Sequence, residues 1–115
     1  MLSLKNRFHG HNTVRRVYRS GHSARNTLGS IHVVQGERVP ITKVAVVVSR
    51  KVDKSAVRRN RIRRRIYEII RIGLDDFKAP SEVVITVYQA EAATLPAGQL
   101  EASVHELCKK AKILN

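Results

Sequence analysis

The chain has 115 residues and carries 22 Lys and Arg side chains against 9 Asp and Glu, which gives a formal charge of +13. This length suits one compact domain, residues 1–115, and a hydrophobic content of 43% is enough for a core. The single cysteine excludes a disulfide scaffold, and the apolar runs are too short for a membrane-spanning helix. We therefore expect a soluble, cytoplasmic protein whose charge attracts polyanions, with nucleic acid or a membrane surface as the leading partner.

The positive charge lies in two blocks. Residues 1–26 carry six cations and no acid, and residues 50–65 carry nine cations against one acid. Residues 66–115 hold five cations and seven acids, so the second half of the chain is slightly acidic. Both blocks are rich in arginine, whose guanidinium suits bidentate phosphate contacts and stacking on bases.

A short amphipathic helix is expected near the N-terminus. Val14, Val17 and Tyr18 recur at helical spacing between a cap at Asn12 or Thr13 and a stop signal at Gly21. The outer face of this helix carries arginines. An Arg-rich, acid-free N-terminus also fits a transit peptide, but the helical pattern favours the structural interpretation.

Two strands separated by a turn follow this helix. The first, Leu28–Val34, is moderately hydrophobic, and Gln35–Pro40 contains the glycine and proline of a turn. The second, Thr42–Ser49, contains the run Val44–Val48, which is apolar on both faces of the pleat. Because β-branched residues on both faces are typical of a strand covered on both sides, we expect this strand at the centre of the sheet.

The spacing of the apolar residues changes after Ser55. Isoleucines at i, i+4, i+7 and i+8 predict a helix over residues 56–72 with an aliphatic side and a polar side, ending at Gly73. Residues 75–80 connect it to a buried strand, Glu82–Tyr88, and a last helix opens at 95–98. The aliphatic stripe of the first of these helices is Ile62, Ile66, Ile69 and Ile70, its polar side is Asn60, Arg61, Arg64, Glu68 and Arg71, and the stripe of the last helix is Leu100, Val104, Leu107 and Ala111.

These elements predict an α+β fold. Their order is α-β-β-(β)-α-β-α, where the bracketed strand has no assigned position, and no internal repeat is present. We expect a small α/β sandwich with a mostly antiparallel sheet.

No combination of residues suggests a self-sufficient active site. Cys108 falls beside the apolar stripe of the last helix, which favours a core thiol over a nucleophile. The five histidines are scattered without the spacing of a zinc site, and we expect no metal site in the protein. Asp75 and Asp76 could hold Mg²⁺, but two adjacent acids on a loop are more typical of a solvated surface.

The arginine-rich start of the 56–72 helix is the strongest functional signal. Six arginines in eight positions place like charges at i, i+3 and i+4, and cations near a helix N-terminus oppose the macrodipole at a cost of about 0.3–1 kcal/mol each. A bound polyanion would relieve both penalties, whereas a merely solvated face would mix signs. The six are Arg58, Arg59, Arg61, Arg63, Arg64 and Arg65.

A second surface is predicted between the first helix and the sheet. Tyr18 and His32 could stack there on unpaired bases, while Lys43, Arg50 and Lys51 attract phosphates. Each of these side chains also has a packing or rim interpretation, which the sequence leaves open.

A resemblance to a known family rests on two adjoining segments. Ser49-Arg50-Lys51 ends a buried strand, and Ala56-Val57-Arg58-Arg59-Asn60-Arg61-Ile62-Arg63-Arg64 opens the amphipathic helix. Together they resemble the signature of the bacterial ribonuclease P protein subunit, whose Arg-Asn-Arg motif matches Arg59-Asn60-Arg61. The similarity extends from Arg7 to the terminal helix and so covers nearly the whole chain.

The resemblance implies a subunit of a ribonucleoprotein endonuclease that removes the 5′ leader of precursor tRNA. The RNA subunit and its bound Mg²⁺ would perform the hydrolysis, and the protein would carry no catalytic residue and no cofactor of its own. The implied partners are the catalytic RNA and precursor tRNA, with no membrane and no DNA. The implied fold resembles the second domain of a small-subunit ribosomal protein and has an unusual left-handed β-α-β crossover.

The resemblance also implies two sets of contact residues. In the family, Phe is frequent at the position of Val14 and an aromatic residue at that of His32, so the groove of this chain departs from the pattern. The surface for the RNA subunit comprises Arg58, Arg59, Asn60, Arg61, Arg63, Arg64 and Arg65, and the groove for the leader comprises Val14, Tyr18, His32, Lys43, Val46, Ser49, Arg50 and Lys51.

Two other classes of protein fit the same charge. A ribosomal or other structural RNA-binding protein would suit both basic blocks equally well. A DNA-binding module could read the major groove with the 56–72 helix. Against DNA, the isoleucine stripe commits that helix to a sheet, and no second helix is placed for a helix-turn-helix.

Overall fold

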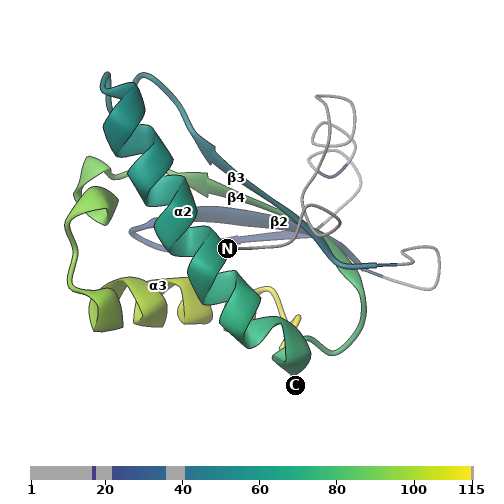
Figure 1. Ribbon diagram of the computed structural model, residues 1–115. Helices are drawn as coiled ribbons and strands as arrows, with labels where there is room; N and C mark the ends of the chain where they lie inside the picture. Colours follow the sequence, from purple (N-terminus) through teal and green to yellow (C-terminus); the bar gives the residue numbers. More distant parts are fainter. Residues whose placement is uncertain (1–16, 18–21, 36–40, 115) are drawn as a thin grey trace.

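The computed structural model describes residue 17 and the ranges 22–35 and 41–114. These residues form a four-stranded sheet and two long helices that pack together as one α+β domain (Figure 1). The elements are β1 (His22–Arg25), β2 (Gly29–Gln35), β3 (Lys43–Val48), α2 (Ala56–Gly73), the 3-10 helix η2 (Leu74–Asp76), β4 (Ser81–Val87), the 3-10 helix η3 (Ala90–Ala93) and α3 (Ala97–Lys110).

The strand order of the sheet is β1-β2-β4-β3. β1 and β4 both pair antiparallel with β2, whereas β3 and β4 are parallel, so the mostly antiparallel sheet is confirmed. The expected central position of the 42–49 strand is wrong, because β3 is the last strand of the order and β4 lies between β2 and β3. Both are short apolar runs, and only the pairing of strands decides which one is central.

The connection from β3 through α2 to β4 is left-handed. In Figure 1 both strands point to the left, β4 lies below β3, and α2 passes in front of the sheet. With the strands turned to point upward, the chain moves from right to left through the helix in front. Since about 98% of such crossovers are right-handed, no general rule predicts this one.

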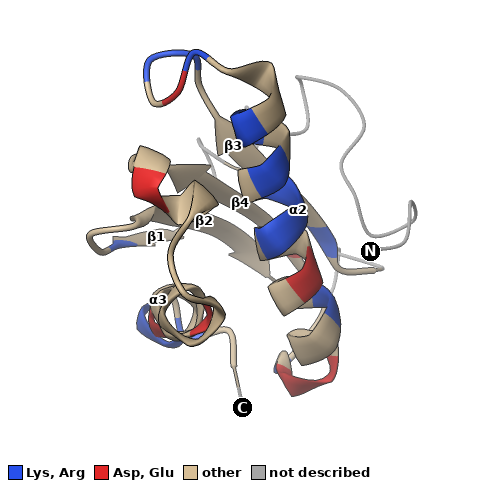
Figure 2. Cartoon of the chain, turned by 60° about the vertical axis from the view of Figure 1, so that its left-hand side comes forward, with Lys and Arg blue, Asp and Glu red and all other residues tan. Residues whose placement is uncertain are grey.

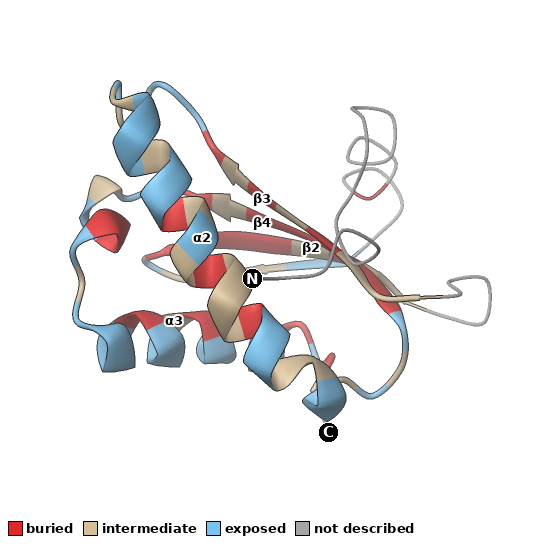
Figure 3. Cartoon of the chain, viewed as in Figure 1, coloured by how far each residue is buried: buried red, intermediate tan, exposed pale blue. Residues whose placement is uncertain are grey.

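The core lies between one face of the sheet and the two helices (Figures 1 and 3). Alternate strand residues point into it, as the pleat requires, and each large side chain that is fully buried contributes about 1.5–3 kcal/mol. The predicted stripes of both helices enter the same core, with Ile69 partly buried. The buried strand residues are Ile31, Val33, Val44, Val46, Val48, Val83, Ile85 and Val87.

Local signals explain where α2 begins. The Ser55 side chain accepts a hydrogen bond from the amide of Arg58 at 3.3 Å, which caps the first turn. On the buried side, the Tyr67 hydroxyl accepts a hydrogen bond from the amide of Val46 at 3.1 Å and so joins α2 to β3.

The strand β1 carries almost no sequence signal. Only Ala24 of its four residues packs against the core, so an alternating pattern is missing. The strand forms because Asn26 closes a tight turn to β2, its Oδ1 accepting from the amides of Leu28 and Gly29 at 3.0 and 3.3 Å. Gly29 is required at this place, since an added Cβ would lie 1.9 Å from the carbonyl oxygen of Thr86.

Two predicted segments fall largely outside the described residues. These are the turn over 36–40 and the helix over 12–21, of which Val17 alone is described, as helical and fully buried. The structure also adds η3, which the sequence did not predict. Within the described ranges, neither α2 nor α3 has the length and apolar character that a membrane crossing needs.

Candidate nucleic-acid interface

The N-terminal half of α2 presents a row of cations to solvent. Figure 2 shows Lys and Arg along the first turns of α2 and in the loop before it, with acids toward the C-terminal end of the helix. Arg58, Arg61 and Arg64 are exposed at intervals of three residues, and the first turn of α2 contains no acid. No acid of this first turn therefore offsets the repulsion at i, i+3 or the unfavourable interaction with the helix dipole.

Asp53 anchors the arginines nearest the loop. Its carboxylate accepts hydrogen bonds from Arg58 Nε at 2.6 Å and from the Ser55 amide at 2.9 Å, while Arg59 donates to the carbonyl oxygens of Asp53 and Lys54, both at 3.0 Å. The hydrogen bond from Arg58, followed by that from the amide, lowers the pKa of Asp53. Sequence reasoning missed this residue, although it is the lone acid among nine cations.

Arg61 and Arg64 are the available members of the predicted surface. Both are exposed, and the described part of the chain offers neither of them a hydrogen bond or an ion pair. Asn60 is also exposed and accepts a hydrogen bond from the half-buried Arg63, which fixes its amide beside them. The Arg-Asn-Arg motif therefore has a polar centre and a free guanidinium on its second arginine.

Arg65 has a different environment from the other arginines. Its guanidinium donates to the carbonyl oxygen of Ala92 at 2.7 Å and also to that of Leu95. Ala92 is fully buried in η3, so Arg65 ties the segment before α3 to the side of α2. A guanidinium with two protein acceptors is less free to bind phosphate than the guanidinium of Arg64, its neighbour in sequence.

A cationic hollow adjoins the row of arginines. It has a volume of about 570 Å³ and lies between the end of β3 and the start of α2. Arg50 and Lys51, predicted as leader contacts, line it together with Lys54, Ala56 and Arg59, which was predicted as a contact to the RNA subunit. The structure thus brings members of both predicted sets to one place.

The second predicted surface lies on the sheet face opposite α2 and α3. His32 and Lys43 alternate with core residues of their strands and so point to this face. Burial, and next the charge of Arg25, lower the pKa of His32, which keeps the ring neutral at neutral pH and able to stack. Ser49 is exposed where β3 ends.

The assignment of Val46 to this groove is wrong. Val46 is only 5% exposed and belongs to the core cluster under α2. The parity of β3 places Ala45 and Val47 on the His32 side instead, because successive side chains alternate between faces. Val14 and Tyr18 lie outside the described residues.

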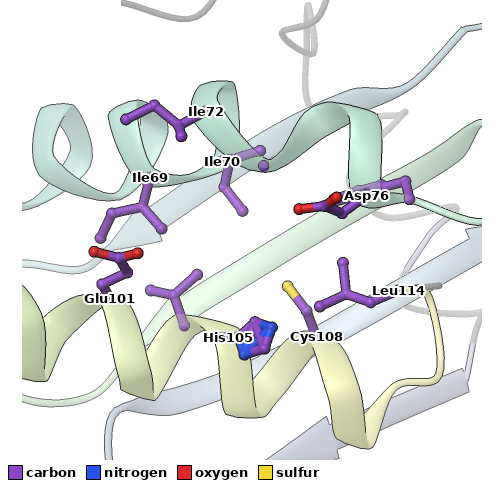
Figure 4. Close-up of a pocket in the computed structure, with 11 residues that line it drawn as sticks. Ile69, Ile70, Ile72, Asp76, Glu101, His105, Cys108 and Leu114 are labelled. Atoms are coloured by element: carbon purple, nitrogen blue, oxygen red, sulfur yellow. The ribbon is translucent and has the colours of Figure 1, made fainter.

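A pocket of about 290 Å³ lies between the end of α2 and α3 (Figure 4). Cys108 and His105 line it from α3, with Asp76 and Glu101 among the other lining residues. Cys108 is buried in the core as predicted, and burial raises the pKa of its thiol to about 11, so the thiolate nucleophile is scarce at neutral pH. The described residues contain no group of three or more His, Cys, Asp or Glu that could hold a metal ion.

The fold and this surface define a small α+β domain with an arginine-rich, solvent-exposed helix face. The family model described as Ribonuclease P matches residues 2–112, and the chain belongs to that family. It is 33% identical over 116 residues to the ribonuclease P protein component of Pseudanabaena, an alignment that covers 100% of this chain and 98% of the relative. The corresponding protein of Clostridium botulinum is 31% identical over 111 residues, with 96% and 98% covered.

Solved structures of the family share the fold. The RNase P protein of Staphylococcus aureus superposes with a TM-score of 0.83 at 23% identity, over 96% of this chain and 98% of that one. The RNase P protein of Thermotoga maritima gives 0.73 at 18% identity, over 84% and 89%. The predicted α+β fold is therefore confirmed across the described residues.

Proposed function

We propose that this chain is the protein subunit of a ribonuclease P ribonucleoprotein and assists the removal of the 5′ leader from precursor tRNA. Family membership over residues 2–112 supports the role of an RNase P protein component. In this proposal the RNA subunit and the Mg²⁺ that it binds perform the hydrolysis, and the protein contributes binding. The partners are the catalytic RNA and precursor tRNA, and neither DNA nor a membrane is involved.

The uncompensated arginines of α2 carry the proposal. Arg61 and Arg64 are exposed, and no described residue accepts a hydrogen bond from either of them. Both project from a helix that the core holds in place. Guanidinium groups at regular intervals along a helix suit the phosphates of a structured RNA, because each planar group can donate two parallel hydrogen bonds to a phosphate. Arg58, Arg59, Asn60 and Arg63 extend this surface.

The sheet face with His32 and Lys43 serves the second half of the proposed role. A single-stranded leader needs a cationic path and flat groups on which its bases can stack. Lys43, Ser49, Arg50 and Lys51 supply the polar and cationic path, and the neutral ring of His32 supplies one stacking surface. Val14 and Tyr18 are expected to complete it.

Reconstitution with a bacterial ribonuclease P RNA tests this function. Addition of the protein is expected to lower the Mg²⁺ concentration needed to cleave precursor tRNA, because cations on the protein reduce phosphate repulsion. Arg61→Ala and Arg64→Ala should weaken binding to the RNA subunit and reduce the salt slope, even with a leaderless substrate. Lys109→Ala, which removes an exposed cation from α3, is the matched control and should have little effect.

A leader-dependent variant separates the two surfaces. Tyr18→Ala is expected to reduce cleavage only of substrates with a leader of several nucleotides. A lack of stimulation at every Mg²⁺ concentration would instead favour a ribosomal or other structural RNA-binding role, and preferred binding of ribosomal RNA fragments would support that alternative.

A further inference from the structure

Tyr88 is an exposed aromatic side chain directly after β4. Among the described residues three large hydrophobic side chains are exposed, and Tyr88, at 53%, is the aromatic one. The residue before it, Val87, is 1% exposed and points into the core, so Tyr88 points to the opposite face of the sheet. That face is the one that carries His32.

The ring of Tyr88 is held in place. Its hydroxyl donates to Ser30 Oγ at 2.9 Å, and its amide donates to the carbonyl oxygen of Leu28 at 2.9 Å. Ser30 is only 3% exposed, so the hydroxyl end of the ring is anchored while much of the ring remains accessible. An ordered aromatic face is a better stacking surface than a mobile one, because less conformational entropy is lost on binding.

Cations occur on the chain after β3 and on β1, at the same end of the sheet as Tyr88. β4 lies between β2 and β3, and Val87 pairs with Val48, so Ser49 of the β3 end reaches the level of Tyr88 about 5 Å away. Arg50 and Lys51 follow and line the cationic hollow. On the other side, Arg25 on β1 pairs with Ser30 and contributes positive charge to the same face, where it lowers the pKa of His32.

We propose that Tyr88 is a stacking site for one unpaired nucleobase of a single-stranded RNA whose phosphates are bound by Arg50 and Lys51. An accessible ring beside a groove of cations is the arrangement by which proteins bind single strands without reading their sequence. The site extends the leader path from His32 to the cationic hollow, where the leader meets the surface for the RNA subunit. This inference rests on the proposed function and adds a contact residue to it.

The test uses the reconstituted holoenzyme and precursor tRNAs that carry 2-aminopurine at one leader position at a time. In the wild-type complex, one position should be quenched by the ring, and Tyr88→Ala should abolish the quenching at that position and leave the fluorescence of the other positions unchanged. Tyr88→Ala should also weaken affinity for leader-bearing substrate by about 5-fold or more, with no change for leaderless tRNA. Tyr88→Phe keeps the ring and should retain most of both effects.

The control is Ile72→Ala, which truncates an exposed hydrophobic side chain at the C-terminal end of α2, away from the arginine-rich start of that helix. It should change neither readout, and circular dichroism should show all variants folded. The inference is overturned if Tyr88→Ala leaves quenching and affinity unchanged, or if leaderless tRNA loses the same affinity. If the protein still stimulates cleavage in that case, and Arg61→Ala and Arg64→Ala still weaken binding to the RNA subunit, the proposed function stands without the stacking site. If the protein does not stimulate cleavage at all, both the proposed function and the stacking site are refuted.

Discussion

Two neighbouring arginines of α2 should fail in opposite ways when each is replaced by methionine. Arg65 donates to two carbonyl oxygens of the segment before α3, whereas Arg64 is exposed without a described protein partner. Methionine keeps most of the length and the helix propensity of arginine, so the substitution removes mainly the charge and the donors. The pair therefore separates an arginine that stabilises the fold from one that binds RNA.

The size of the effect follows from the acceptors that Arg65→Met leaves behind. An unsatisfied buried acceptor costs about 1–3 kcal/mol, and the carbonyl of the buried Ala92 would become one. We expect a loss of about 2 kcal/mol in the free energy of unfolding. With an unfolding entropy of about 2.1 cal/mol/K per residue, this loss lowers Tm by roughly 8 °C. Arg64→Met should change stability by less than about 0.5 kcal/mol.

Urea denaturation and RNA binding measure the two outcomes. Arg64→Met should weaken binding to the catalytic RNA and reduce the slope of log affinity against log salt by about 1, whereas folded Arg65→Met should keep the wild-type slope. Equal Tm values for the two variants would refute the role assigned to Arg65. An unchanged salt slope in Arg64→Met would refute the role assigned to Arg64.

Three further predictions concern the fold. Gly29→Ala should cost about 1–3 kcal/mol in urea denaturation because its Cβ would collide with Thr86, whereas Gly98→Ala, in open space on α3, should stabilise by about 0.5–1 kcal/mol; equal effects would contradict this. Cys108 should resist iodoacetamide at pH 8 until urea unfolds the chain, as its raised pKa requires; rapid labelling of folded protein would contradict its burial. The pKa of Asp53 is lowered in the folded protein, so its ionised carboxylate stabilises the fold above about pH 3.8, the ordinary pKa, and this stabilisation is lost as the pH falls through the lowered pKa. Asp53→Asn should therefore flatten the fall in Tm at acid pH, and an identical fall in both proteins would exclude this linkage.

The sequence predicted the elements whose signals are local. The isoleucine stripe and the stop signal at Gly73 located α2 within a residue of its observed end, and the apolar runs before and after it became β3 and β4. The polar side of α2 was equally predictable, because a core on one side of a helix leaves the opposite side in solvent. The exposure of Arg61 and Arg64 was therefore predictable from the spacing of the isoleucines.

The groove and the sheet order depended on information that the sequence does not contain. Val46 was assigned to the groove although a one-residue step along a strand reverses its face, and an apolar run such as 44–48 gives no parity signal. β1 is a strand only because Asn26 turns it onto β2. The sequence likewise predicted Tyr88 only as the last residue of a buried strand, and the pairing of β4 with β3 shows that it lies next to the end of β3.

By itself, the sequence determined that this protein has an aliphatic core, a two-sided helix and an excess of positive charge concentrated at the start of that helix. These properties follow from composition and spacing along the chain. Only the packed chain shows which arginines have protein partners: Arg65 donates to acceptors in a segment 27 residues away, while Arg64 next to it has no acceptor among the described residues. The tertiary structure also decided that β4 is central, since strand order arises from long-range pairing and not from local pattern.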